Sequence, residues 1–306
     1  DLFVKGVGGF QQPRLAKSSG ATTLRTWSTN DALRVLDDAE EVGLSVVMGI
    51  YVTPVKGYEV NVYGERSSQR QLERLTKVRS DVRAIRNHPA LLMWMVGNEL
   101  TSGSQNTLAN DIAWMHINDI CRVVAEEDFG HHPIGSVVAA SSSLEQTIDA
   151  VLLHAPLVQV LGVNAYHSMA GLPSRIVSAG WMLPVMITEY GPRLGSSRGA
   201  AQAPWGALIE PSTTEKKPLY AQMWQELLRD PEASSIVGTF PFSWGWKWQY
   251  TPTWLFAFNQ WAPSNFTCTD RRPKVGGRPA FCAAPVEWSA IVDFVAEVYD
   301  GVYGRP

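Results

Sequence analysis

Two apolar segments of strand length, each ending in a glutamate, constrain most strongly what this chain can fold into. The first runs over 90–97 and is followed by Asn98 and Glu99; the second runs over 184–188 and is followed by Glu189. Nearly continuous apolar residues indicate strands that are buried on both faces, as in a parallel sheet covered by helices. Because parallel strands end at the same edge of a sheet, we expect the two carboxylates to lie at one face of the fold.

Similar apolar segments recur along the chain, and most are followed by an amphipathic helical pattern. Strands are expected at 3–7, 22–27, 44–51, 90–97, 133–138, 157–164, 184–188 and 235–242. Eight strands that alternate with helices predict an α/β fold, a single (β/α)8 TIM barrel over residues 1–306. The long connections 191–218 and 245–285 follow strands seven and eight, on the face where such barrels carry their binding loops.

Helix ends are predicted from capping residues. Asn30 is expected to cap the helix that follows the second strand, and Gly43 to end that helix. Ser142 and Glu145 have the spacing of a capping box at the start of a later helix. Further helices are expected over 67–86, 107–127 and 286–299.

Charge and hydropathy exclude two classes of partner. A net charge of −3 gives no basic field for a polyanion, so nucleic acid is not an expected partner. No apolar run approaches the roughly 18 to 20 residues that a membrane-spanning helix needs. The oligomeric state is not predicted.

Cysteine positions bear on the compartment. Cys121 falls in a helical apolar pattern and is expected to fill core space. Cys268 and Cys282 flank a loop rich in Pro, Gly and Arg, where a local disulfide is favoured over two free thiols, and Asn265 begins a glycosylation triplet in the same loop. Since the chain begins at Asp1, a signal peptide or an upstream region is expected to have been removed. These features predict secretion or a secretory-pathway lumen.

The two strand-end glutamates have a chemical interpretation as a pair. A retaining glycosidase uses two carboxyl groups about 5 to 5.5 Å apart, one as nucleophile and the other as acid and then base. Glu99 and Glu189 would face each other across the mouth of the predicted barrel. A lone glutamate at a strand end is more often a structural ion pair or a cap, so the hypothesis rests on the pair.

Ordered motifs around these glutamates make the chain resemble a known group. It is similar to the catalytic barrel of glycoside hydrolase clan A, with family 2 as the closest pattern and the fungal glucanosyltransferases of family 72 sharing two elements. The resemblance rests on His88-Pro89, Trp94-x-x-Gly97-Asn98-Glu99, Asn164-x-Tyr166 and Thr188-Glu189-Tyr190-Gly191. These motifs follow one another in the expected order over most of the chain.

The resemblance implies roles for individual residues. Glu99 would be the acid/base and Glu189 the nucleophile, and Asn98 would hydrogen-bond the sugar 2-hydroxyl. Arg25 matches an arginine beneath the nucleophile, and Tyr166 matches a donor to it. A cation and a hydroxyl would keep Glu189 ionised, whereas Glu99 needs surroundings that raise its pKa. The simpler alternatives are a structural salt bridge for Arg25 and rim packing for Tyr166.

Aromatic residues are concentrated after the eighth strand, where rigid rings could bind the apolar faces of sugars. The resemblance places the sugar platform at Trp244, and Trp27, Trp205 and Trp246 are candidates for further subsites. Core packing is the alternative for each tryptophan.

Two further residues complete the candidate substrate-binding set, and the remaining histidines are not expected to bind a metal. Asn164 and His167 are the candidates, with a structural histidine as the alternative for His167. His88 and the pair His131-His132 precede strands on the opposite face of the barrel, so no metal and no cofactor are predicted.

The predicted function is a retaining glycoside hydrolase or transglycosylase that acts on β-linked glycans, with a β-glucan favoured. The expected partner is therefore an oligosaccharide or polysaccharide substrate. The alternatives are an exo-acting β-glycosidase of the family 2 type, on a galactoside, mannoside or glucuronide, and an inactive carbohydrate-binding barrel. Two departures from family 2 bear on the substrate: the sandwich domains usual before that barrel are not present in this chain, and the sequence over 239–246 differs from the expected pattern.

Overall fold

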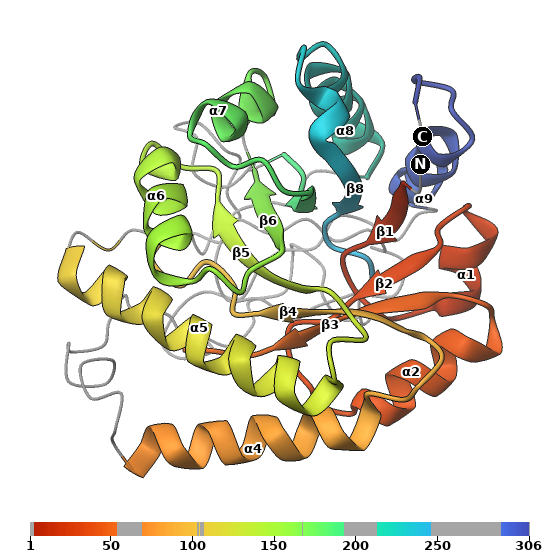
Figure 1. Cartoon of the computed structure of the whole chain (residues 1–306). Coiled ribbons are helices and arrows are strands. Elements are labelled where there is room, and N and C mark those ends of the chain that lie inside the picture. Colours follow the sequence, from red (N-terminus) through yellow and green to blue (C-terminus); the bar gives the residue numbers. More distant parts are fainter. Residues whose placement is uncertain are drawn as a thin grey trace, which may run out of the picture.

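Eight parallel strands form a closed barrel, which confirms the predicted fold. The structure is a computed structural model that describes residues 3–53, 69–102, 104, 107–166, 168–192, 213–245 and 289–305. Each strand pairs in parallel with the next, and β8 closes on β1 (Figure 1). The strands are β1 (Val4–Val7), β2 (Thr23–Arg25), β3 (Ser45–Ile50), β4 (Leu91–Val96), β5 (Ile134–Ala139), β6 (Val160–Ala165), β7 (Val185–Tyr190) and β8 (Ile236–Pro241).

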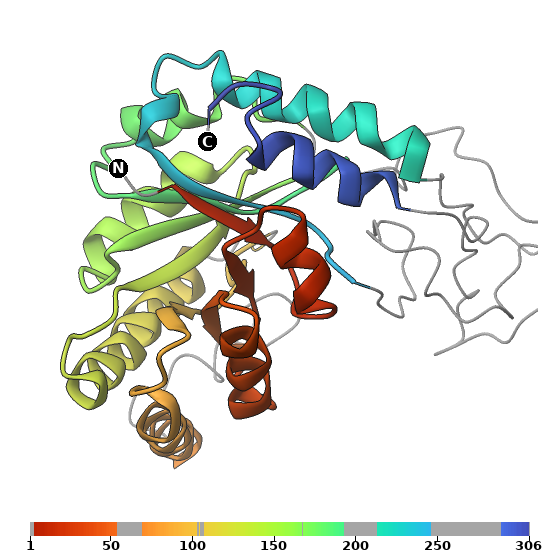
Figure 2. The ribbon, with the colours of Figure 1, turned by 90° about the vertical axis from the view of Figure 1, so that its right-hand side faces the viewer.

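Helices follow the strands and cover the outside of the barrel (Figure 1). They are α1 (Pro13–Ser18), α2 (Ala32–Glu41), α4 (Gln69–Ile85), α5 (Thr107–Asp128), α6 (Leu144–His154), α7 (Leu172–Ser178), α8 (Thr213–Leu228), the short η1 (Ala233–Ser235) and α9 (Ala290–Tyr299). Figure 2 shows α8 and α9 side by side next to β8 and β1. The hydroxyl of Tyr299 on α9 ties these two strands together by donating to the carbonyl oxygens of Gly6 and Thr239.

The alternation of side chains along each strand separates two hydrophobic cores. On β4, Met93 and Met95 belong to a small cluster inside the barrel, whereas Trp94 and Val96 belong to the larger core against the helices. This inward and outward alternation is the period of two expected for a strand that is buried on both faces. The inner cluster also contains Val4, Val47, Val137, Val160, Met186 and Phe240.

Two predicted helix caps are wrong. Asp31, not Asn30, precedes α2, and its side chain makes no capping hydrogen bond. Ser143, not Ser142, precedes α6, also without a side-chain cap. Glu145 instead pairs with Arg175 of α7, whose guanidinium donates to the Glu145 carboxylate at 2.7 and 3.0 Å. A charged partner on the neighbouring helix has replaced the local capping interaction.

The helices after the two long connections begin at other residues than predicted, the first earlier and the second later. α8 begins at Thr213, so it already includes Pro218, and α9 begins at Ala290 rather than at residue 286. None of the described helices is long and apolar enough to cross a membrane.

The cysteines are described only in part. Cys121 is a buried free thiol on α5, and burial raises its pKa to about 12, which fits an unreactive core residue. Cys268, Cys282 and Asn265 lie outside the described residues. The disulfide and secretion therefore stay predictions.

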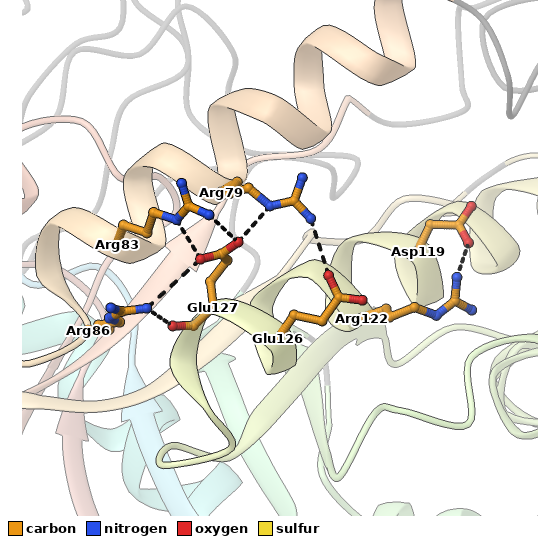
Figure 3. A network of polar contacts seen from close by, with 7 residues as sticks. All are labelled: Arg79, Arg83, Arg86, Asp119, Arg122, Glu126 and Glu127. Atoms are coloured by element: carbon orange, nitrogen blue, oxygen red, sulfur yellow. Dashed lines mark hydrogen bonds and ion pairs between the residues drawn. The ribbon is translucent and has the colours of Figure 1, made fainter.

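A cluster of arginines joins α4 to α5 at the amino-terminal face of the barrel strands (Figure 3). Glu127 accepts from Arg79 Nε at 2.6 Å and from Arg83 Nε and Nη2 at 2.5 and 2.9 Å. Arg86 donates to the Glu127 carbonyl oxygen. Hydrogen bonds from Arg83 and Arg79 hold the pKa of the Glu127 carboxyl below its usual value. This cluster lies opposite the strand ends that carry Glu99 and Glu189, so its role is structural.

We expect Glu127→Gln to lower the thermal unfolding midpoint at pH 7, because the uncharged amide cannot pair with the guanidinium groups. A carboxyl with a lowered folded-state pKa stabilises the fold above its unfolded pKa of about 4.3, and this contribution is lost as the pH falls through the lower folded value. The gap between variant and wild type in calorimetric midpoints should therefore close below about pH 4. Glu126→Gln, an exposed neighbour with one 3.2 Å contact to Arg79, is the control. A gap that stays constant with pH would contradict the charge argument.

Candidate active site

A sharp turn at the end of β4 fixes the position of Glu99. Gly97 has φ = +74° and Glu99 has φ = +51°, so the chain passes twice through the left-handed region. Two backbone hydrogen bonds hold this turn: Gly97 N donates to Ile50 O at 2.9 Å, and Glu99 N donates to Val137 O at 3.0 Å. A side chain with an uncommon backbone conformation, fixed between neighbouring strands, is typical of a functional position.

Glu189 lies within β7 and accepts hydrogen bonds on both carboxylate oxygens. Arg25 Nη1 and Trp27 Nε1 donate to Oε1 at 2.8 and 2.7 Å, and the Tyr166 hydroxyl donates to Oε2. Arg25 and Glu189 form a salt bridge whose side chains are 1% and 4% exposed. The guanidinium carbon also lies 4.9 Å from the centre of the Trp27 ring. The donors come from β2, from the turn after it and from the residue that follows β6, so the barrel itself orients this carboxylate.

Two asparagines connect Glu189 to Glu99. Arg25 Nη2 donates to Asn98 Oδ1 at 2.8 Å, and Asn164 Nδ2 donates to Asn98 Oδ1 at 3.2 Å and to Glu99 Oε1 at 2.8 Å. Because a guanidinium only donates, the Asn98 atom that it meets must be the oxygen, which in turn requires the Asn164 nitrogen opposite. The orientation of both amides is thus fixed, and no described residue accepts from the Asn98 nitrogen, which can meet a ligand.

Register explains how Asn164 reaches both carboxylates. β6 and β7 shift register between Val163 and Asn164, so that Asn164 pairs with Glu189 instead of Thr188. Thr188 Oγ1 donates to Asn164 Oδ1 at 2.8 Å, and the Thr188 carbonyl oxygen accepts from Arg25 at 2.7 Å. The irregularity rotates β7 enough to present Glu189 to the site while Thr188 supports the asparagine.

A phenylalanine ring packs between two of the donors to Glu189. The ring of Phe242 is 5.5 Å from Trp27 and 6.0 Å from Tyr166, edge to face with both. Its carbonyl oxygen accepts from the buried hydroxyl of Tyr220 on α8. A Cβ at Gly191 would lie 2.7 Å from that hydroxyl, so glycine is required where the chain leaves β7. α8 thereby supports the residues that orient Glu189.

The Tyr166 hydroxyl is held in its protonated form. Burial raises its pKa well above the usual value, and the nearby charges of Glu189 and Glu99 raise it further, against a smaller opposing effect of Arg25. Both carboxylates therefore act on this hydroxyl, which keeps its proton for the hydrogen bond to Glu189.

The structure brings together most of the predicted site residues. They are Glu99, Glu189, Arg25, Trp27, Asn98, Asn164 and Tyr166. Trp27, predicted to line a subsite, also donates to Glu189. His167 and Trp246, like Trp205, lie outside the described residues.

Trp244, the predicted sugar platform, does not lie where the resemblance placed it. It is 3% exposed and belongs to the main hydrophobic core, and its backbone nitrogen donates to the Gly8 carbonyl oxygen. A ring so deeply buried presents almost no surface to a sugar. The aromatic ring of this segment that packs against Trp27 and Tyr166 is that of Phe242, two residues earlier.

Sequence reasoning missed Thr188 and Phe242 as parts of the site. Thr188 stood inside the motif that contains Glu189, but its contacts depend on the register shift, which leaves no signal in composition. Phe242 ended the predicted eighth strand, and a strand end on the active face was the signal that could have identified it.

Asp37, Glu40 and His88 are residue types that bind metals, but the hydrogen bonds of His88 do not fit a metal site. His88 Nε2 lies 3.1 Å from Asp37 Oδ1 and 3.7 Å from Glu40 Oε2. The Ala90 N–H donates to His88 Nδ1 at 3.2 Å, so Nδ1 carries no proton and Nε2 does. A proton on Nε2 removes the lone pair that a metal would need. The cluster instead ties α2 to the start of β4.

Comparison with solved structures finds the same barrel in larger enzymes. A β-galacturonidase from Eisenbergiella tayi bound to galacturonate has a TM-score of 0.59 at 17% identity, and a β-D-glucuronidase of Dictyoglomus thermophilum has 0.60 at 16%. A β-glucuronidase from Ruminococcus gnavus in complex with D-glucuronic acid has 0.56 at 13%. The matches cover 98%, 98% and 97% of this chain but 51%, 50% and 49% of the other chains, so this chain spans about half their length. At these identities the likeness shows the fold alone.

Comparison with curated protein sequences gave no significant match. The model of a protein family, described as glycosyl hydrolases family 2, TIM barrel domain, matches residues 16–239. This range covers most of the chain and contains both strand-end glutamates. It also contains the arginine and the tyrosine that the carboxylate network uses. The chain therefore belongs to glycosyl hydrolase family 2, through its TIM barrel domain.

Proposed function

We propose that this chain is the catalytic barrel of a retaining β-glycosidase. The observation that carries the proposal is the hydrogen-bond network that joins Glu189 to Glu99 through Arg25, Asn98 and Asn164. Both oxygens of Glu189 act as acceptors, as they do in an ionised carboxylate. One oriented carboxylate with a second carboxyl group held nearby is the equipment of a double displacement. An inactive binding barrel would have no use for this arrangement.

In the first step a Glu189 oxygen attacks the anomeric carbon while the bond from that carbon to the leaving oxygen breaks. Glu99 gives its proton to the leaving oxygen, so the product is a free hydroxyl and a covalent glycosyl ester of Glu189. Three donors hold Glu189 during the attack, so little reorientation is needed. The Asn98 amide nitrogen, the donor left over from the network, would meet the sugar 2-hydroxyl.

In the second step Glu99, now ionised, takes a proton from water or from a sugar hydroxyl. The resulting oxygen attacks the anomeric carbon and the Glu189 carboxylate leaves, which restores both groups and retains the configuration. Water gives hydrolysis and a sugar hydroxyl gives transfer. The same residues serve both outcomes.

For the substrate we propose a β-linked glycan, with a β-glucan chain as the leading class. The support is the concentration of aromatic residues after the eighth strand, which suits an extended sugar chain. The second candidate is a β-uronide, because the structural neighbours include a β-galacturonidase and β-glucuronidases.

Incubation with laminari-, cello-, manno- and galacto-oligosaccharides, and with p-nitrophenyl β-glucuronide and β-galacturonide, separates these candidates. We expect mass spectrometry to show products from the gluco-oligosaccharides. Products shorter than the input indicate hydrolysis, and longer products indicate transfer. Release of nitrophenol from the uronides alone would replace the β-glucan proposal with the uronide one.

Azide rescue tests the two roles separately. On an activated aryl β-glycoside, we expect Glu99→Ala to lower kcat by about 10²- to 10⁴-fold and Glu189→Ala to lower it further, since the covalent step is lost. Azide should give a β-glycosyl azide with Glu99→Ala, because Glu189 still forms the ester, and an α-glycosyl azide with Glu189→Ala, identified by NMR. Glu126→Ala, on the opposite face, is the control. An α-glycosyl azide from Glu99→Ala and a β-glycosyl azide from Glu189→Ala would exchange the two roles. Near-normal turnover by Glu189→Ala would show that Glu189 is not the nucleophile.

The hydroxyl of Tyr166 should resist ionisation. Because its pKa is raised well above the usual value of about 10, it should contribute no phenolate absorption between pH 9 and 11. Alkaline ultraviolet titration of wild type and Tyr166→Phe should thus give the same increase at 295 nm over this range. An excess of one tyrosine equivalent in the wild type would show that Tyr166 titrates normally and is not buried beside the carboxylates.

A further inference from the structure

A hollow of about 630 Å³ opens beside the carboxylate network, between the ends of β2 and β3 and one side of α4. Its volume falls within the range of about 300 to 1,000 Å³ typical of small-molecule sites. Trp27 is the one donor to Glu189 described above that also lines the hollow. The hollow therefore needs an explanation of its own.

Trp27 connects the hollow to the catalytic carboxylate. Its ring lines the hollow, while its Nε1 donates to Glu189 Oε1 at 2.7 Å. β3 can pass this close to Trp27 only because residue 49 is a glycine, where a Cβ would lie 2.4 Å from the Trp27 carbonyl carbon. A molecule in the hollow would touch Trp27, one side chain away from the proposed nucleophile.

The lining combines apolar surface with hydrogen-bonding groups. Ile50 and Val78 are apolar, and Tyr51, which is 61% exposed, adds an accessible aromatic ring to the lining. Asp81 accepts from Thr29 Oγ1 at 2.6 Å and from Lys77 Nζ at 2.5 Å. An exposed ring beside fixed polar groups matches a sugar unit, which has apolar C–H faces and hydroxyls that both donate and accept.

The charges of the hollow favour a neutral ligand. Lys77 is paired with Asp81, and Arg74 Nη1 is 3.1 Å from His116 Nε2. Glu73 adds a further carboxylate to the lining. The lining contains two cations and two carboxylates, so it offers no net positive charge to an anion.

We propose that this hollow is a second sugar-binding subsite, in which Tyr51 stacks on a glycosyl unit of the substrate beyond the one held at Glu189. The proposal rests on the proposed function and deepens it: the substrate would be an oligosaccharide of neutral sugars. Trp27 would contact the sugars in both subsites, so the two units would be adjacent in the chain.

The experiment compares a short and a long substrate in Tyr51 variants. Wild type, Tyr51→Ala, Tyr51→Phe and the control Leu72→Ala, exposed on α4 outside the hollow, are assayed on a p-nitrophenyl β-monoglycoside and on the trisaccharide of the same sugar. We expect Tyr51→Ala to lower kcat/KM on the trisaccharide by about tenfold, as lost stacking implies. Its value on the monoglycoside should not change. Tyr51→Phe, which keeps the ring, should stay within about twofold on both substrates.

Equal losses on both substrates, or no loss on the trisaccharide, would overturn the subsite. Calorimetric binding of laminaritriose, cellotriose and mannotriose to Glu189→Gln, with and without Tyr51→Ala, separates this proposal from the catalytic one. If the double variant binds the trisaccharide more weakly but the wild type shows no turnover, the subsite is supported and the proposed enzymatic function is rejected. If the wild type shows turnover but Tyr51→Ala leaves binding unchanged, the enzymatic function is supported and the subsite is rejected. If no trisaccharide binds, the subsite is rejected.

Discussion

The buried guanidinium of Arg25 is the interaction on which the site depends. An almost fully buried cation is costly unless it is paired and hydrogen-bonded. Here it meets the Glu189 carboxylate, the Asn98 amide oxygen and the Thr188 carbonyl oxygen, and it lies over the Trp27 ring. Because Arg25 needs these acceptors, each of them keeps one orientation. The orientation of the Asn98 amide then sets that of Asn164, which donates to Glu99. The orientation of both carboxylates thus follows from one buried charge.

The barrel separates this arrangement from the groups that stabilise it. Glu127 and its arginines join α4 to α5 near the starts of the strands, and the tie between His88 and Asp37 lies near the start of β4. The carboxylate network lies at the other ends of the strands. The ion pairs of Glu127 and of His88 therefore join the helices and the start of β4 at a distance from the carboxylates of the proposed reaction.

The sequence predicted the features that depend on local pattern and failed on those that depend on contacts between strands. Apolar runs located all eight strands, and the two strand-end glutamates followed directly. The capping box of Ser142 and Glu145 was wrong because capping signals are local and compete with tertiary partners, here the pairing of Glu145 with Arg175. The misplaced platform at Trp244 and the missed Phe242 have another cause: the direction of a side chain at a strand end is set by register and curvature, not by composition.

The same buried cation bears on the fate of the proposed covalent intermediate. When Glu189 becomes an ester, its negative charge disappears, and Arg25 is left buried against neutral acceptors, the oxygens of Asn98, Thr188 and the ester. A buried cation that loses its counter-charge raises the energy of that state. Departure of Glu189 as a carboxylate restores the ion pair, so Arg25 favours the second step over accumulation of the ester. On this argument Arg25 would do more than orient the proposed nucleophile: it would also make Glu189 a better leaving group in the second step.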